Sequence, residues 1–195
     1  NNTAIINSTI NKYIYGGYID DADVFAKIDL YADNNHLSII GSKVHGSLYG
    51  GFVMHNNAYT NVTNFEDEIT NVCNNSIVLE NSSVGKQDSI SSIYGGYVGH
   101  QWGFKNIVSN NKVTIQDCKN DNKIFANIYG GHGYSYEGIY TGVNVEESSD
   151  KWIADLHQAE KFDFKSSAND VKIYNSEILG EIKGGSLKTD DAKNA

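Results

Sequence analysis

Five copies of a two-block unit run through this 195-residue sequence. The first block opens on Asn, alternates apolar and polar residues, and has Ser or Cys at its eighth position. Its copies start at Asn1, Asn35, Asn75, Asn111 and Asn169. The second block reads apolar–Tyr–Gly–Gly–aromatic or His at 14–18, 48–52, 93–97 and 128–132, with a degenerate copy at 182–186. Segments of similar sequence that recur at intervals along a chain indicate a repeat architecture.

The repeat predicts an all-β protein. Alternation of apolar and polar residues is typical of a strand with one buried face. A unit of two short strands cannot bury its apolar face alone, whereas stacked units share a continuous core. The chain has no Pro, which suits strands that are hydrogen-bonded on both sides. Gly-Gly suits a tight corner or bulge. We therefore expect a parallel β-helix, a solenoid of about five coils over residues 1–195.

A β-propeller is the main competing fold, because its blades also repeat every 40 to 50 residues or so. Each blade needs four strands joined by hairpins, but this sequence offers two clear strand blocks per unit. It also has no regular Asn-Gly or Asp-Gly hairpin signal. The repeat favours the β-helix.

Composition excludes several classes of function. The formal net charge is −9 and all 15 basic residues are Lys, so the clustered Lys and Arg that bind nucleic acid are missing. A phosphoryl-transfer enzyme with an arginine finger is excluded for the same reason. No apolar run approaches the 18 residues of a membrane span. The chain opens on Asn1 without an initiator Met or signal peptide, and we expect it to be part of a much longer chain.

The reiterated Ile-Tyr-Gly-Gly-Tyr-Val and Asn-Asn-x-Val-x-Ile segments resemble the passenger repeats of bacterial autotransporter adhesins, which use type V secretion. The resemblance covers nearly the whole chain outside residues 134–167. It implies a right-handed β-helical shaft on the bacterial surface, outside the outer membrane, that mediates adhesion. It also implies few or no cysteines. Similar stacked β-helices occur in phage tail spikes and polysaccharide lyases.

Aromatic residues recur at two positions of the second block. Tyr15, Tyr49, Tyr94 and Tyr129 share one position, and Tyr18, Phe52, Tyr97 and His132 share the position three residues further on. In a stack with matched register each set forms a column of rings. The columns either fix the register or present an aromatic stripe to a sugar or protein. Their facing stays open, because Gly-Gly interrupts strict alternation.

The leading Asn residues also fall in one column, where stacked amides can hydrogen-bond between repeats. The two cysteines, Cys73 and Cys118, occupy different positions of the repeat. Along one coil these positions lie nine residues apart, which in extended chain exceeds the reach of a disulfide unless the turns of the coil bring them together. We expect two free, buried thiols.

Three titratable residues, Asp21, His55 and His100, lie six residues past successive Tyr positions. They are weak candidates for a metal site or a pH-sensitive site, and the alternative is a solvated turn. The segment 20–23 carries three Asp but lacks the pattern of a calcium loop. Carboxylates are scattered and no nucleophile motif occurs. We therefore expect neither a catalytic residue nor a cofactor.

Residues 134–167 interrupt the repeat and form an expected insertion on the solenoid. Trp152, Leu156 and Ala159 have helical spacing, which predicts a short helix over 151–164. The insertion either carries binding, with Trp152 as a candidate contact, or covers exposed edges of the solenoid.

Together these features predict a non-catalytic adhesin fragment that binds a protein or glycan on host or bacterial cells. Tyr15, Tyr49, Tyr94, Tyr129 and Trp152 are its candidate binding residues. A carbohydrate-binding or polysaccharide-degrading β-helix protein, like a tail spike or lyase, is one alternative. A purely structural spacer is the other.

Overall fold

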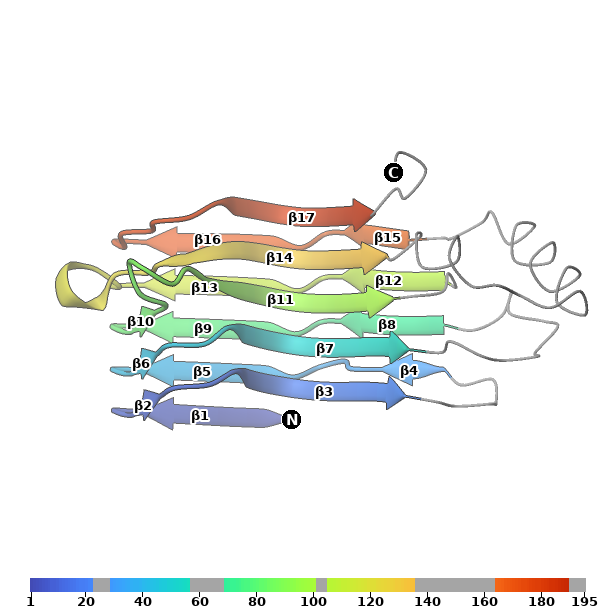
Figure 1. Ribbon diagram of the computed structural model, residues 1–195, viewed down its shortest axis with the longest axis horizontal. Coiled ribbons are helices and arrows are strands. Elements are labelled where there is room, and N and C mark those ends of the chain that lie inside the picture. The colour runs from blue at the N-terminus through green and yellow to red at the C-terminus, as the bar shows by residue number, and fades with distance from the viewer. Residues whose placement is uncertain (23–28, 57–68, 101–104, 136–163, 190–195) are drawn as a thin grey trace, which may run out of the picture.

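The protein is all-β in the computed structural model, which describes residues 1–22, 29–56, 69–100, 105–135 and 164–189 (Figure 1). Within these ranges the only helical segment is a 3-10 turn, η1 (Asn120–Asn122). None of the described segments is a helix of the length and apolarity needed to cross a membrane.

Four parallel sheets, here named A to D, contain the strands. Sheet A consists of β1 (Asn2–Ile6), β5 (His36–Ile40), β9 (Ser76–Glu80), β13 (Lys112–Gln116) and β16 (Asp170–Tyr174). Sheet B consists of β2 (Thr9–Ile10), β6 (Lys43–Val44) and β10 (Ser83–Val84). Sheet C consists of β3 (Ile14–Ala22), β7 (Leu48–Asn56), β11 (Ser91–His100), β14 (Ala126–Ser135) and β17 (Ile182–Thr189). Sheet D consists of β4 (Leu30–Tyr31), β8 (Ile69–Cys73), β12 (Lys105–Ser109) and β15 (Phe164–Ser167).

The register of the sheets matches the sequence repeat residue for residue. Ile39 of β5 lies opposite Ile5 of β1 and Leu79 of β9. Tyr94 of β11 lies between Tyr49 and Tyr129 in the same way. All pairs among the strands β1 to β17 are parallel, which rules out the hairpin-linked blades of a propeller. The predicted alignment of equivalent positions is therefore confirmed.

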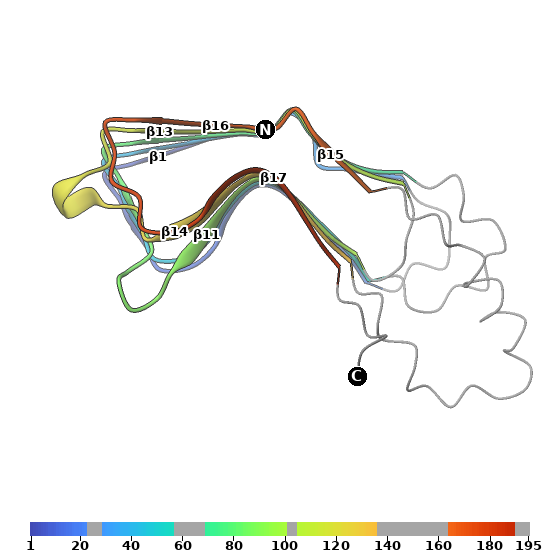
Figure 2. The same cartoon turned by 90° about the horizontal axis from the view of Figure 1, so that it is seen from above.

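Viewed along the direction in which the strands stack, sheet C is bent, with its concave side turned away from sheets A and D (Figure 2). The bend divides the interior into two apolar cores. One core lies between sheets A, B and the first half of sheet C, and is built on residues such as Leu37, Leu79 and Ile93. The other lies between sheet D and the second half of sheet C, and contains Val53, Val72 and Val98.

The leading Asn residues form a buried amide ladder between the two cores. The Asn35 amide and backbone N–H both donate to Asn75 Oδ1, at 2.8 and 3.0 Å. Asn75 donates in the same way to Asn111, and Asn111 to Asn169. The predicted column is confirmed.

Gly-Gly makes room for this ladder. A Cβ at Gly51 would lie 2.5 Å from Asn75 Nδ2 and 2.5 Å from the Ala32 carbonyl oxygen. A Cβ at Gly50 would collide with the carbonyl oxygen of Gly95 on the neighbouring strand. The two blocks of the repeat are thus coupled, because the Asn of one repeat packs on the Gly-Gly of the repeat before it.

Residues in the left-handed region mark the turn before four strands of sheet A and the turn after all five. Before the strands they are Asn34, Asn74, Asn110 and Ala168, with φ between 52° and 57°. After the strands they are Asn7, Gly41, Asn81, Asp117 and Asn175. Asn, Asp and Gly tolerate this conformation best, which accounts for the Asn-Asn pairs at the block boundaries.

The eighth position of the first block forms a second hydrogen-bonded ladder. The backbone N–H of Ser42 donates to Ser82 Oγ at 3.0 Å, and that of Ser82 donates to Cys118 Sγ at 3.4 Å. Cys118 therefore replaces a serine. Both cysteines are free, as expected. Cys118 is buried, but Cys73 is only half-buried.

The expected insertion over 134–167 is bounded by strands on both sides. Strand β14 extends to Ser135, and residues 164–167 form β15, which pairs in register with β12. The helix expected over 151–164 therefore does not reach Phe164. The rest of that helix, with Trp152, lies outside the described residues.

Candidate functional site: an aromatic wedge on sheet C

Gly-Gly places two aromatic residues per strand on the concave outer side of sheet C. In β3, Ile14 and Ile19 contact the two cores, while Tyr15 and Tyr18 lie on the other side of the strand. Strict alternation would put residues three apart on opposite faces, so the glycine step brings the two rings to one face. We call the resulting eight side chains the aromatic wedge: Tyr15, Tyr49, Tyr94, Tyr129, Tyr18, Phe52, Tyr97 and His132.

The predicted tyrosine column is continuous through the first four repeats. Ring centroids of Tyr15 and Tyr49 are 4.8 Å apart, those of Tyr49 and Tyr94 5.2 Å, and those of Tyr94 and Tyr129 5.0 Å. The ring planes differ by only 11° to 19°. Stacking of this kind adds about 0.5–1.5 kcal/mol per pair beyond burial.

The second column is also stacked, with its widest step between Tyr97 and His132 at 5.5 Å and 27°, and its tyrosine and phenylalanine rings meet the first column edge to face. Phe52 lies 5.2 Å from Tyr18 and 5.1 Å from Tyr97, with ring planes within 6°. Tyr49 and Phe52 contact each other across the bend at 5.1 Å with an interplanar angle of 82°. The wedge therefore fills the concave angle of sheet C.

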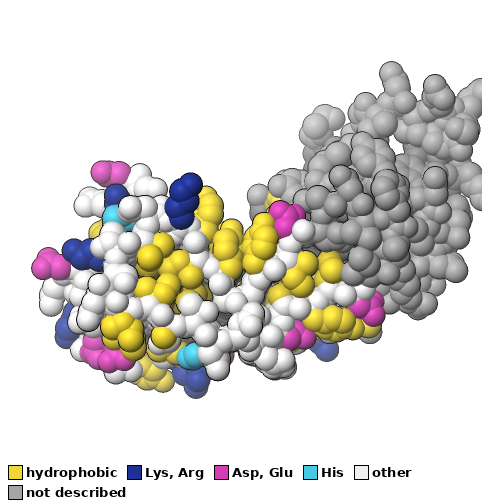
Figure 3. Space-filling view, turned by 90° about the horizontal axis from the view of Figure 1, so that it is seen from below, with side chains coloured by type: hydrophobic (Ala, Val, Ile, Leu, Met, Phe, Trp, Pro, Cys, Tyr) yellow, Lys and Arg dark blue, Asp and Glu magenta, His cyan; other side chains and the backbone are white. Residues whose placement is uncertain are grey.

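Stacking leaves ring edges and hydroxyl groups, rather than ring faces, available along the wedge. Tyr49, Tyr94 and Tyr129 are half-buried, Tyr18 is 52% exposed, and Phe52 is 8% exposed. Figure 3 looks onto the end of the stack that carries β1 and shows hydrophobic side chains gathered around a notch in its outline.

Burial and end groups set the electrostatics of the wedge. Burial raises the pKa of Tyr49 and of Tyr94 above the usual tyrosine value. At one end, Tyr18 donates its hydroxyl hydrogen to Asp20 Oδ2 at 2.8 Å. At the other end, Lys183 Nζ lies 5.8 Å from the Tyr129 ring centroid and pairs with Glu181 at 2.8 Å. The charged side chains beside the wedge thus lie at its two ends.

The candidate metal column is aligned only at the level of the backbone. Asp21 pairs with His55, and His55 pairs with His100. The side chains of all three lie outside the described part of the structure, so their role stays a prediction. Among the described residues no group of three potential metal ligands is found.

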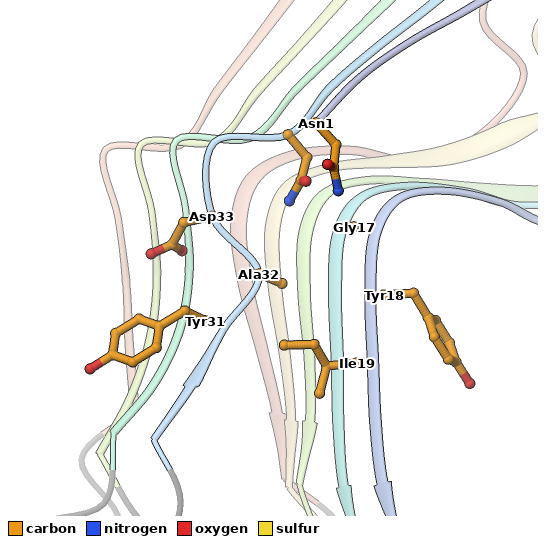
Figure 4. Close-up of a pocket in the computed structure, with 8 residues that line it drawn as sticks. Asn1, Gly17, Tyr18, Ile19, Tyr31, Ala32 and Asp33 are labelled. Atoms are coloured by element: carbon orange, nitrogen blue, oxygen red, sulfur yellow. The ribbon is translucent and has the colours of Figure 1, made fainter.

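A cavity of about 340 Å³ opens beside the ladder at the β1 end of the stack, between β3 and β4. Ile19 and Ala32 face each other across it, while Tyr18, Tyr31 and Asp33 turn outward (Figure 4). Burial raises the pKa of Asp33, whose carboxylate accepts the Cys73 N–H at 2.7 Å. This carboxylate holds a backbone group rather than facing the cavity.

Sequence reasoning found the tyrosine column but missed the polar groups that flank it. Ser47 precedes Tyr49 by two residues, and its hydroxyl accepts the N–H of Ser92 at 3.0 Å. Asn127 accepts the N–H of Glu181 in the same manner at 2.9 Å. The signal was present as a polar residue two positions before each tyrosine of the inner repeats.

Comparison with known proteins gives no match: no family model, curated protein or solved structure matches this chain.

Proposed function

We propose that this chain is a segment of a right-handed parallel β-helix that serves as the shaft of a secreted, autotransporter-type adhesin on the bacterial surface. Each repeat contributes one strand to sheet A, and equivalent residues of these strands lie opposite one another from repeat to repeat. Strand–crossover–strand connections in parallel sheets are almost always right-handed, which supports the handedness. The proposed activity is binding to a partner on host or bacterial cells, without catalysis.

The observation that carries this proposal is the aromatic wedge. Its two ring columns run across four consecutive strands of sheet C and keep a partly exposed tyrosine in each of these four strands. Aromatic residues that combine a rigid apolar body with a polar tip are favoured at binding surfaces. A surface that repeats along a shaft also gains from avidity.

Cell binding by the labelled chain tests the proposal. We expect the double variant Tyr18→Ala, Tyr97→Ala to lose at least tenfold in affinity for bacterial or epithelial cells, because it opens a gap in the wedge. The matched control is Tyr31→Ala, Tyr174→Ala, which removes two exposed tyrosines from sheets D and A. Equal binding of both variants would place the binding surface elsewhere.

A structural spacer is favoured by one specific observation, namely that neighbouring rings occupy each other's faces. In that case the wild-type chain binds no cells, and the wedge variant only lowers the free energy of unfolding. Measuring cell binding and urea unfolding on the same variants separates the two functions.

A further inference from the structure

We infer that the aromatic wedge takes a neutral, linear glycan that lies along the stack and crosses the strands of sheet C. This inference rests on the proposed function and names the chemical class of its ligand.

The period of the tyrosine column selects a polymer. The same ring recurs at steps of 4.8, 5.2 and 5.0 Å. A ligand lying along the column meets an identical group at every step, so it gains from each step only if its own unit repeats on that length. One sugar ring in an extended chain adds close to one such step. An extended peptide presents equivalent side chains every two residues, about 6.7 Å, and falls out of step with the column.

The groups that the wedge presents suit hydroxyl-rich ligands. Because the ring faces are occupied, a ligand meets ring edges and phenol hydroxyls. A phenol hydroxyl both donates and accepts hydrogen bonds, as sugar hydroxyls do. At neutral pH a tyrosine hydroxyl is protonated and able to donate, and burial raises the pKa of Tyr49 and Tyr94 further above the usual value near 10. Beside them, Ser47, Ser92 and Asn127 add a parallel line of polar side chains.

The distribution of charge favours a neutral glycan over an acidic one. In the three central repeats, the described residues of the wedge and of its polar flank carry no permanent charge. Asp20 lies at one end, and the Lys183–Glu181 pair lies at the other. With a net charge of −9 for the chain, a polyanion gains no general attraction.

Calorimetric titration with oligosaccharides of defined length tests this inference. The probes are one to six units of β-1,4-linked glucose, β-1,4-linked N-acetylglucosamine and α-1,4-linked glucose. An oligogalacturonate and an extended tyrosine-rich peptide serve as competitors. We expect at least one neutral series to gain tenfold or more in affinity between two and four units and to level off beyond, since the described column has four tyrosines.

Variants that keep the ring and remove the hydroxyl give the second readout. Tyr49→Phe and Tyr94→Phe should each weaken binding of the four-unit probe two- to tenfold, the range of one hydrogen bond. Tyr174→Phe, on the outer face of sheet A, should leave it unchanged. The inference would be overturned if none of the three neutral series bound, or if the oligogalacturonate or the peptide bound more tightly than they do. It would also be overturned if Tyr49→Phe and Tyr94→Phe bound the four-unit probe as tightly as the wild type.

The outcome is distinguishable from that of the proposed function. Cell binding that depends on the wedge but survives periodate oxidation of cell-surface glycans upholds the adhesin and overturns the glycan. Oligosaccharide binding without cell binding upholds the glycan ligand and overturns the adhesin.

Discussion

Inside the molecule, single buried side chains supply hydrogen-bond partners for polar groups of neighbouring repeats. Asn111 is the clearest case. It is 0% exposed and accepts two hydrogen bonds from Asn75, both at 3.0 Å. Its own amide donates to the Val72 carbonyl at 2.8 Å and to Asn169 Oδ1 at 3.0 Å. One side chain therefore joins Asn75 and Asn169 of the neighbouring repeats to the backbone of Val72 in the second core.

Replacement of Asn111 by Leu should lower the free energy of unfolding by about 3 kcal/mol or more. The change leaves both Asn75 donors and the Val72 carbonyl without this partner, and each buried polar group left unsatisfied costs about 1–3 kcal/mol. Urea unfolding measures the effect. Asn2→Leu, at an exposed position of β1, is the control, and matching unfolding curves for the two variants would contradict the ladder.

Ala168 is the one residue of its turn column that is not Asn. Its φ of 52° matches those of Asn34, Asn74 and Asn110, and the left-handed conformation costs Ala about 1 kcal/mol more than Asn. Ala168→Asn should therefore stabilise the protein by about 0.5–1 kcal/mol, and Asn110→Ala should destabilise it by a similar amount. Thermal unfolding of both variants checks the pair, and shifts of the same sign would refute the argument.

Cys118 should accept replacement by Ser with little change in stability. Its Sγ accepts the Ser82 N–H at 3.4 Å and donates to the Gln116 carbonyl at 3.3 Å, as the serines of the column do. Cys118→Ala removes the acceptor and should cost about 1–2 kcal/mol. Urea unfolding of the two variants tests this, and a Ser variant less stable than the Ala variant would be the contrary result.

Among the elements, sheet C couples stability to pH through its tyrosines. Burial raises the pKa of Tyr49 and Tyr94 in the folded protein above the unfolded value near 10. Below pH 10 both states hold the proton and this contribution is complete. As the pH rises above 10, the unfolded chain loses protons that the folded chain retains, and the free energy of unfolding falls.

We therefore expect stability to decline above pH 10, with the decline less steep in Tyr49→Phe. Urea unfolding between pH 8 and 11.5 measures the free energy of unfolding, and absorbance at 295 nm follows the formation of tyrosinate. Tyr174→Phe, an exposed tyrosine on sheet A, should leave the slope unchanged. A Tyr49→Phe slope equal to that of the wild type would remove Tyr49 from the explanation.

Sequence patterns predicted sheets A and C well and sheet D poorly, for a physical reason. In β5 and β9 the inward positions are Leu or Ile, so alternation is visible. In β8 and β12 the inward positions include Thr70 and Asn106, buried polar residues that obscure it. The facing of Tyr15 and Tyr18 could not be predicted either, because it depends on the bend at Gly-Gly rather than on the pleat.

At the scale of the whole molecule, stability passes from repeat to repeat. In the described part of the chain each strand pairs with the equivalent strand of the repeat before or after it, so a lesion in the centre weakens two interfaces and a lesion at the end weakens one. Gly95 and Gly184 occupy the same position of the repeat, one inside the stack and one in its last described strand. They allow the same substitution to be compared at both places.

Gly95→Ala should cost about 2–3 kcal/mol, because its Cβ would collide with the backbone carbonyl oxygen of Gly130 and strain a packed interface. Gly184→Ala should be close to neutral, since its Cβ would meet only Asn169 O at 3.4 Å, an ordinary contact. Hydrogen exchange should show lost protection in β7, β11 and β14 for the first variant and change confined to β17 for the second. Equal destabilisation by the two variants would mean that contacts between repeats do not govern the stability of the stack.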